Sequence, residues 1–380
     1  MSTVTQEQKK RYFEISALGV FLCVLVVFIH VASAPLNALD SKSWQYVAIM
    51  IPRRGFAFVV QGFIFLSGLK LFLSENKTFS YGKYLLKRFK HIILPYIIWV
   101  VIYYVYFAYY RRYFPFRIKD LLAYIYTGDL VSPFYYIIII AQFYLLAPLW
   151  RRIIAAANPV ILTAFSVMIT VISWKYLPGV ISALFPGSAF AYSDRVFTSY
   201  LIFWIAGCFA GRQYERFKKI LHENRTLIRA GFVISLVFYL YLCYLRFSLL
   251  RNITFLDDVR IMYCMSAILF FFLAAVRLSG KAYGNTAPGN TAPGNTAPGN
   301  TAPGNIASRA IKMIHGADRI SYSIYLAHCL VIFELDRILE IYADLPVKFS
   351  FPLRLLIVYA VTILASLLWN KLKSQAVKNA

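Results

Sequence analysis

Long apolar runs separated by short, basic connections make up most of this chain. A helix needs about 20 mostly apolar residues to cross the hydrocarbon core of a bilayer. Runs near that length recur along the whole sequence, so the pattern predicts an all-α polytopic membrane protein with about ten transmembrane helices. The predicted spans are Ile15–Ala34, Phe56–Leu73, His91–Tyr110, Pro133–Trp150, Pro159–Tyr176, Val196–Gly211, Leu227–Leu245, Ile261–Val276, Ile320–Leu339 and Pro352–Trp369.

The lysines and arginines between the runs predict the orientation, because cytoplasmic loops carry an excess of these residues. An even number of spans with the N-terminus inside puts both termini in the cytoplasm and most of the basic connections with them. One basic cluster falls on the opposite side, at Arg111, Arg112, Arg117 and Lys119. The neighbouring segment Lys119–Thr127 is too short to span and is expected at the interface.

A tandem repeat interrupts the apolar pattern. Gly284–Pro303 is four copies of Gly-Asn-Thr-Ala-Pro, and Gly304-Asn305 begins a fifth. Such a segment brings glycine, proline and no large apolar side chain, so it predicts a flexible cytoplasmic loop at 284–305. We interpret residues 1–380 as a single membrane domain that contains this loop.

The amino-acid composition agrees with a membrane protein and argues against a soluble domain or a nucleic-acid-binding protein. The chain is 60% hydrophobic and only 15% charged, whereas soluble domains are nearer to half apolar. Its net charge of +24 lies mostly between the apolar runs, which favours topology and anionic headgroups over nucleic acid as its cause. The five cysteines lie within apolar runs and none has a metal-binding spacing. They are interpreted as packing residues, and no metal site is predicted.

His30 is the first candidate for chemistry, because it lies deep inside the run Ile15–Ala34. An ionisable side chain within a span is costly and usually faces a cavity or a partner. Histidine can move a proton near neutral pH, so His30 is a candidate general base. The alternative is a neutral histidine bonded to a backbone carbonyl.

The second apolar run is preceded by Arg53 and Arg54, carries Gln61 inside and ends on Ser67-Gly68. Small residues at that end allow close helix approach. The arginines are either interfacial anchors or an anion or carbonyl clamp beside His30, because the first two spans form a hairpin.

Two further stretches combine polar and apolar residues. Before the third span, Arg88, Lys90 and His91 either follow the positive-inside rule or bind the phosphates of a cytosolic donor, and sequence alone favours the first reading. In the ninth span, Tyr325 and His328 are three residues apart and share a helix face. His328 is either a hydrogen-bonded structural histidine or part of a functional site.

Five motifs follow one another along the chain: Val26–His30, Phe63–Gly68, Lys87–Tyr96, Pro133–Tyr136 with Tyr144–Pro148, and Ser323–His328. Taken in this order, they resemble the acyltransferase-3 family of integral membrane acyltransferases. The resemblance implies a ten-span enzyme of the bacterial cytoplasmic membrane. Such an enzyme takes its acyl group, often acetyl, from cytoplasmic acyl-CoA and transfers it to a surface or lipid-linked glycan.

The resemblance also implies roles for individual residues. His30 would take the proton of the acceptor hydroxyl, and Arg54 would hold substrate or the oxyanion. Arg88, Lys90 and His91 would bind CoA phosphates. The substrate pocket would be lined by Gln61, Tyr135, Tyr136, Tyr325 and His328. Acyl-CoA is expected as a donor substrate and not as a resident cofactor.

Two positions depart from the family pattern. The family commonly has arginine eleven residues before the histidine of the first span, where this chain has Gly19. It often has arginine in place of His91. The missing arginine keeps open the alternative of a non-catalytic partner in glycan assembly. Ten spans with polar residues inside them also suit a polysaccharide transporter or flippase, although no inverted repeat is evident and the spans contain few acidic residues.

Overall fold

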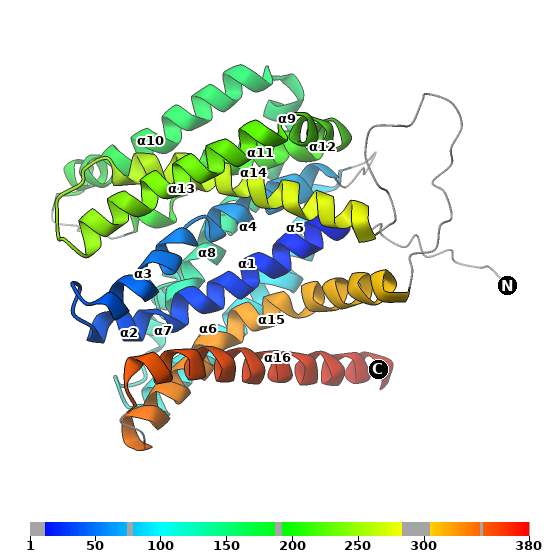
Figure 1. The fold of residues 1–380 in the computed structure, drawn as a ribbon. Helices are drawn as coiled ribbons and strands as arrows, with labels where there is room; N and C mark the ends of the chain where they lie inside the picture. The colour runs from blue at the N-terminus through cyan, green and yellow to red at the C-terminus, as the bar shows by residue number, and fades with distance from the viewer. Residues whose placement is uncertain (1–11, 74–78, 187–191, 283–304, 343–344, 380) are drawn as a thin grey trace.

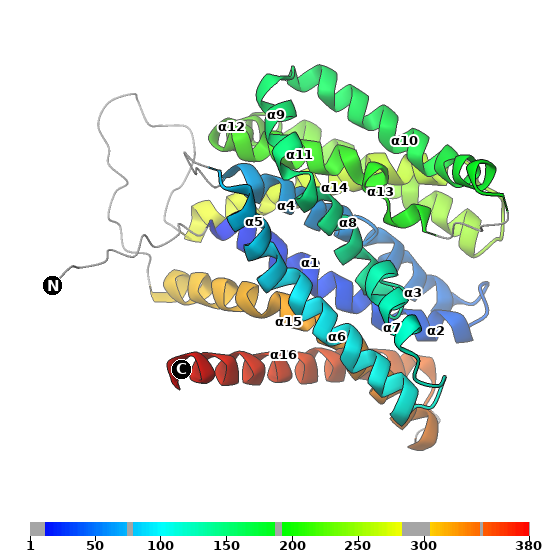
Figure 2. The ribbon, with the colours of Figure 1, turned by 180° about the vertical axis from the view of Figure 1, so that it is seen from behind.

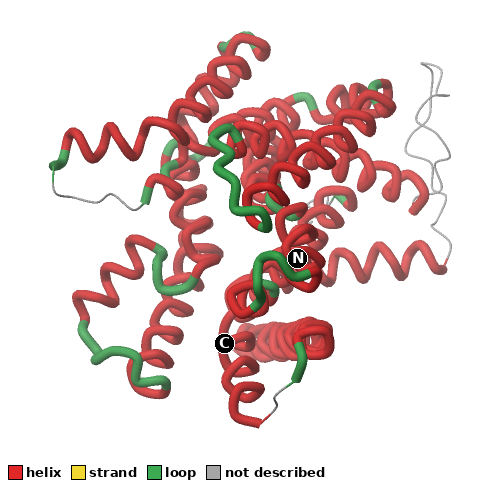
Figure 3. Tube along the Cα trace, turned by 60° about the vertical axis from the view of Figure 1, so that its left-hand side comes forward, coloured by secondary structure: helices red, strands yellow, loops and turns green. Residues whose placement is uncertain are grey.

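The computed structural model describes residues 12–73, 79–186, 192–282, 305–342 and 345–379, and every regular element in these ranges is helical (Figure 3). Apart from Asn305, the predicted repeat loop lies outside them. The α-helices are α1 (Phe13–Val31), α2 (Ser33–Ala38), α3 (Trp44–Gly55), α4 (Val59–Leu73), α5 (Tyr81–Arg88), α6 (Leu94–Val105), α7 (Ile118–Thr127), α8 (Tyr135–Leu145), α9 (Ala147–Ala156), α10 (Pro159–Leu184), α11 (Leu201–Arg212), α12 (Tyr214–Glu223), α13 (Arg225–Phe247), α14 (Leu256–Ala282), α15 (Asn305–Tyr342) and α16 (Val347–Asn379).

Seven described segments are long and apolar enough to cross a membrane, and the bent pair Ile118–Thr127 with Ser132–Leu145 would make an eighth. The seven are Phe13–Ala38, Trp44–Leu73, Tyr81–Tyr110, Pro159–Leu184, Arg225–Phe247, Leu256–Gly280 and Val347–Lys371. Each matches one predicted span, and the bent pair, bent by 55°, overlaps the predicted span Pro133–Trp150. The prediction of an all-α protein with several membrane helices is therefore confirmed.

The other two predicted spans, Val196–Gly211 and Ile320–Leu339, do not meet this criterion. In the first, helix α11 has only 12 residues. In the second, the uncharged part of α15 runs only from Ile320 to Phe333, because acidic and basic residues flank it on both sides. A count of ten spans stays a prediction.

The second span begins earlier than its apolar run indicates. The run Val47–Ile51 already lies in α3, and only the short turn Phe56–Phe58 separates α3 from α4. The two helices together give the candidate span Trp44–Leu73. Arg53 and Arg54 therefore lie near the middle of this element and not at its start, which argues against the interpretation as interfacial anchors.

Helix α1 lies between the two sides of the bundle and packs against α4, α14, α15 and α16 (Figure 1). Seen from behind, α5 and α6 cross the bundle as one long diagonal (Figure 2). Peripheral helices α10, α13 and α16 expose large apolar side chains such as Val160, Val237 and Leu356, as expected for surfaces that contact lipid.

The elements expected on the cytoplasmic side lie at one end of the bundle. Both ribbon views place the start of α1, the end of α16, and helices α5, α9 and α12 at this end, with α2 and α7 at the other (Figures 1 and 2). The start of the first described helix and the end of the last one therefore lie on the same side of the bundle. That this side is the cytoplasmic one stays a prediction.

Helices α4 and α11 approach so closely that only glycine fits between them. A Cβ on Gly68 would lie 2.6 Å from the backbone oxygen of Trp204. Cβ atoms on Gly207 and Gly211 would overlap the backbone oxygens of Phe65 and Leu69, respectively. The predicted role of the small residues at the end of the second span, close helix approach, is confirmed for Gly68.

We expect Gly207→Ala to lower the free energy of unfolding by about 1–3 kcal/mol, because the added methyl group forces two backbones apart. Thermal unfolding of the purified protein in detergent measures this. Gly231→Ala is the matched control, since nothing lies within 4 Å of its Cβ position on α13. Equal effects of the two substitutions would contradict the packing argument.

Candidate active site

A cavity of about 370 Å³ opens between α1, α3, α4, α8 and α14. Its wall includes the predicted site residues His30, Arg54, Gln61, Tyr135, Tyr136 and Tyr325. These residues come from five helices, α1, α3, α4, α8 and α15. The structure therefore brings together all the residues expected in the pocket except His328, which lies directly behind His30.

His30 lies in the last turn of α1, half-buried on the cavity wall. The ring of His328 is fully buried, and its centroid is 5.2 Å from that of His30. Nδ1 of His328 is 3.2 Å from the carbonyl oxygen of Ile324, one helical turn earlier. The predicted shared face of Tyr325 and His328 is confirmed, with ring centroids 6.3 Å apart.

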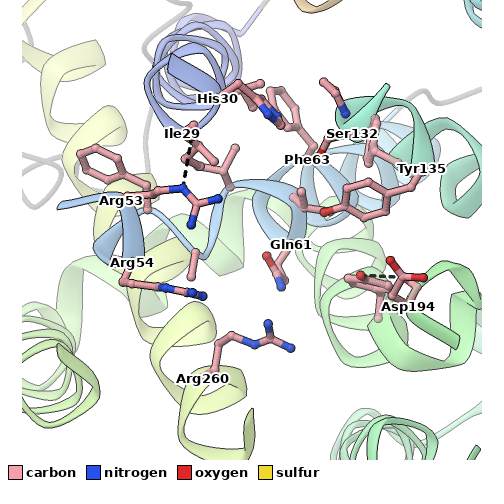
Figure 4. Close-up of a pocket in the computed structure, with 18 of the residues that line it drawn as sticks. Ile29, His30, Arg53, Arg54, Gln61, Phe63, Ser132, Tyr135, Asp194 and Arg260 are labelled. Atoms are coloured by element: carbon pink, nitrogen blue, oxygen red, sulfur yellow. Dashed lines mark hydrogen bonds between the residues drawn. The ribbon is translucent and has the colours of Figure 1, made fainter. Parts of the chain in front are cut away.

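The adjacent side chains of Arg53 and Arg54 make different contacts. Arg53 donates from Nε to the carbonyl oxygen of Ile29 at 3.2 Å and so pairs a carbonyl group in the last turn of α1 (Figure 4). Arg54 instead stacks its guanidinium on the ring of Phe247, 3.5 Å from the centroid. Within the part of the chain that the structure describes, its buried Nε has no hydrogen-bond partner, and neither has Oε1 of Gln61. Unpaired buried polar atoms are costly, so both atoms are suited to a bound ligand.

Two charged residues of the wall, Arg260 and Asp194, were not among the predicted site residues. Gln61 and Arg260 point toward each other from opposite walls (Figure 4). Arg260 also lies over the ring of Trp174, at 4.6 Å. Burial raises the pKa of the Asp194 carboxyl above its ordinary value, while the Arg195 guanidinium acts in the opposite direction.

With three arginines against one carboxylate, the lining of this cavity carries excess positive charge. The only sequence signal for Arg260 was a basic residue immediately before an apolar run. Asp194 lies in a connection that no motif singled out.

A second cavity, of about 210 Å³, lies toward the start of α1 and is lined by Gly19, Ser67, Lys70 and Asp318, among others. Three aromatic residues, Phe63, Tyr136 and Tyr325, belong to the walls of both cavities. We call these three residues the neck.

Their ring centroids are 5.9 Å apart for Phe63 and Tyr136 and 6.0 Å apart for Tyr136 and Tyr325. The neck therefore lies between two chambers that follow one another along α1.

Tyrosine hydroxyls hold α15 in place beside these cavities. Tyr325 donates to the carbonyl of Pro133, and Tyr322 donates to that of Ile92 at 2.6 Å. From α6, Tyr103 donates to the carbonyl of Leu326 at 3.0 Å and accepts from the amide of Leu330 at 2.8 Å. These bonds fix the turn of α15 that carries Tyr325 and His328.

The basic residues expected to bind CoA phosphates do not line either cavity. Arg88 is half-buried and lies over the rings of Tyr84 and Tyr144. Lys90 and His91 are exposed, and Nδ1 of His91 is 2.8 Å from the carbonyl oxygen of Lys87. Their proposed role in donor binding stays a prediction.

Residues 13–370, nearly the whole chain, match the sequence model of a family described as an acyltransferase domain, acyltransferase-3. The chain belongs to the acyltransferase-3 family. Comparison with curated proteins and with solved structures finds no match. Membership in this family and the apolar helices together support a multi-pass membrane acyltransferase.

Family membership makes Gly19 informative. Acyltransferase-3 proteins commonly have arginine here, and in this chain the position forms part of the wall of the second cavity. A Cβ at Gly19 would lie 3.4 Å from Oδ1 of Asp318. Oδ2 of the same carboxylate accepts a hydrogen bond of 3.1 Å from Ser16. The second cavity of this acyltransferase-3 protein therefore has a carboxylate beside a position that is usually cationic.

We expect Tyr325→Phe to destabilise the protein by about 1–3 kcal/mol, because it leaves the carbonyl of Pro133 without its hydrogen bond. Tyr126→Phe is the control, because that side chain is 83% exposed on α7. Thermal unfolding in detergent compares the two. An unchanged midpoint for Tyr325→Phe would show that this bond does not hold α15.

Proposed function

We propose that this protein transfers an acyl group, acetyl in the simplest case, from acyl-CoA to a hydroxyl of a cell-surface or lipid-linked glycan, in a bacterial cytoplasmic membrane. The observation that carries this proposal is the first cavity. Its wall carries His30 together with buried polar atoms of Arg54 and Gln61 that have no hydrogen-bond partner among the described residues. A base and unpaired hydrogen-bonding atoms around one space are the components that acyl transfer needs.

The chemistry requires no covalent intermediate on the enzyme. His30 accepts the proton of the acceptor hydroxyl as that oxygen attacks the thioester carbonyl. The carbonyl oxygen then carries negative charge, which Arg54 is placed to stabilise. Collapse breaks the carbon–sulfur bond, and the proton on His30 passes to the departing sulfur. The products are an ester and free CoA.

The two chambers suit two substrates that arrive from opposite sides. The second cavity lies toward the end of the bundle predicted to be cytoplasmic, where acyl-CoA is available. Its acyl group would pass the neck to reach His30. At about 1.5 Å rise per residue, the eleven residues from Gly19 to His30 span roughly 16 Å of α1. A donor with a long flexible arm, such as the pantetheine of CoA, suits this route.

The first cavity suits a glycan acceptor. Its aromatic side chains, among them Trp174 and Tyr135, present flat apolar surfaces against which sugar rings can pack. The excess of arginine favours an acceptor that carries phosphate or carboxylate, because guanidinium binds such groups with paired hydrogen bonds. A lipid-linked sugar, with its phosphates, has this chemistry.

We expect His30→Ala to reduce acyl transfer by about 10²- to 10⁴-fold, the usual contribution of a general base. The measurements are mass spectrometry of surface glycans from cells that carry either form, and release of free CoA thiol by the purified protein. The control, His222→Ala, removes a histidine of α12 that lines neither cavity. Full glycan acylation by His30→Ala protein that is present in the membrane would refute the proposal. Absence of thioester cleavage by the unaltered protein would favour a transporter.

The neck predicts a preference for small acyl groups. We expect Phe63→Ala to raise the rate with butyryl-CoA relative to acetyl-CoA by about tenfold or more, because removing a large ring admits a longer chain. Initial rates with the two donors measure this ratio. Phe21→Ala is the matched control, since its ring packs on Phe271 and lines neither cavity. An equal shift in both variants would exclude the neck as the selective element.

A further inference from the structure

Three potential metal ligands converge behind the wall of the first cavity. They are His30 at the end of α1, and His328 and Cys329 on α15. One ligand atom from each lies within 4.8 Å of the other two. No local spacing indicates this cluster, because His30 is separated from the other two by most of the chain.

The hydrogen bonds of His328 assign the roles of its two ring nitrogens. Nδ1 lies 3.2 Å from the carbonyl oxygen of Ile324, which can only accept, so the proton of the neutral ring belongs on Nδ1. Nε2 is then the acceptor, and the thiol of Cys329 donates to it with Sγ 3.4 Å away. Loss of that thiol proton would leave both Nε2 and the thiolate able to bind a metal ion. A histidine whose second nitrogen donates to a carbonyl is the usual arrangement of a metal-ligating imidazole.

We propose that His30, His328 and Cys329 bind a thiophilic divalent cation, Zn²⁺ in the first instance, with a fourth position open to the first cavity. Zinc bonds of about 2.0–2.1 Å to nitrogen and 2.3 Å to sulfur put neighbouring tetrahedral ligand atoms about 3.5 Å apart. The pair on α15 already has that spacing. Rotation of His30, which borders open space, brings the third ligand into place.

Charge makes the cysteine the decisive ligand. On binding, the thiol of Cys329 releases its proton to water and coordinates as a thiolate. Two neutral imidazoles and one thiolate leave the bound ion with a single positive charge. Without the thiolate, two charges would have to be held among apolar helices, which is far more costly.

A bound ion would act as an inhibitor, and this consequence rests on the proposed function. A nitrogen of His30 that coordinates zinc cannot accept the proton of an acceptor hydroxyl. The ion would also occupy the part of the cavity where that hydroxyl must lie. Acyl transfer is therefore expected to fall as the site fills and to recover when a chelator removes the ion.

The binding test uses the purified full-length protein in detergent and Co²⁺ as a spectroscopic probe for zinc. We expect about one bound ion, a sulfur-to-cobalt charge-transfer band and the strong visible bands of tetrahedral cobalt, all displaced by Zn²⁺. Cys329→Ser and Cys329→Ala should lose the charge-transfer band. Cys264→Ser is the matched control, since Cys264 is a fully buried cysteine on α14. It should keep the band. Thermal unfolding confirms that the variants are folded.

The inhibition test measures acyl transfer against free Zn²⁺, with each variant normalised to its own rate in chelator. The half-inhibitory concentration should rise by at least about tenfold in Cys329→Ser and stay unchanged in Cys264→Ser. No sulfur-to-cobalt band in the unaltered protein, or the same band in folded Cys329 variants, would overturn the metal site. Cobalt binding at Cys329 without zinc inhibition would overturn the inhibitory role alone. If instead His30→Ala kept full transfer, the proposed function would fail while the cobalt result still decided the site.

Discussion

A polar backbone group inside an apolar bundle must find its partner within the protein, and this constraint underlies the structure. Wherever a helix ends or bends, its carbonyls lose their helical partners. Here side chains from other helices replace them. Arg53 bonds to Ile29 at the end of α1, Tyr263 donates to Gly55 where α3 breaks, and Tyr96 donates to Ile125 near the end of α7 at 2.9 Å. The abundance of tyrosine in this chain has a structural purpose as well as an interfacial one.

These same bonds position the chemistry. The break after α3 turns the chain so that Arg54 and Gln61 reach one cavity, and Tyr103 fixes the turn of α15 that holds His328 behind His30. The part of the cavity that carries Arg54 and Gln61 is thus built around a helix irregularity, while Asp194 comes from a connection. Its reactive groups lie on elements that are hydrogen-bonded to one another across the bundle, which is how a site on helices keeps its geometry.

Much of this could be predicted from the sequence, because apolar runs determine where membrane helices lie. His30 and Arg54 were expected to meet because consecutive spans form a hairpin, and they do line one cavity. Arg260, Asp194 and the pairing of Cys329 with His30 were not found, because they depend on contacts between distant helices that no local spacing encodes. The early start of the second span was missed for another reason. Two arginines and a proline follow the apolar run of α3 and separate it from the apolar run of α4.

The close contact of α4 with α11 also determines which wall of the cavities can move. Glycines on both helices put backbone against backbone, so α4 cannot tilt or slide without separating from its neighbour. Phe63 is carried on α4, so its backbone position in the neck is fixed. Hydrogen bonds from Tyr103 and Tyr322, together with that of Tyr325, hold α15 as well. A change in the width of the neck must therefore come from rotation of side chains and not from movement of whole helices.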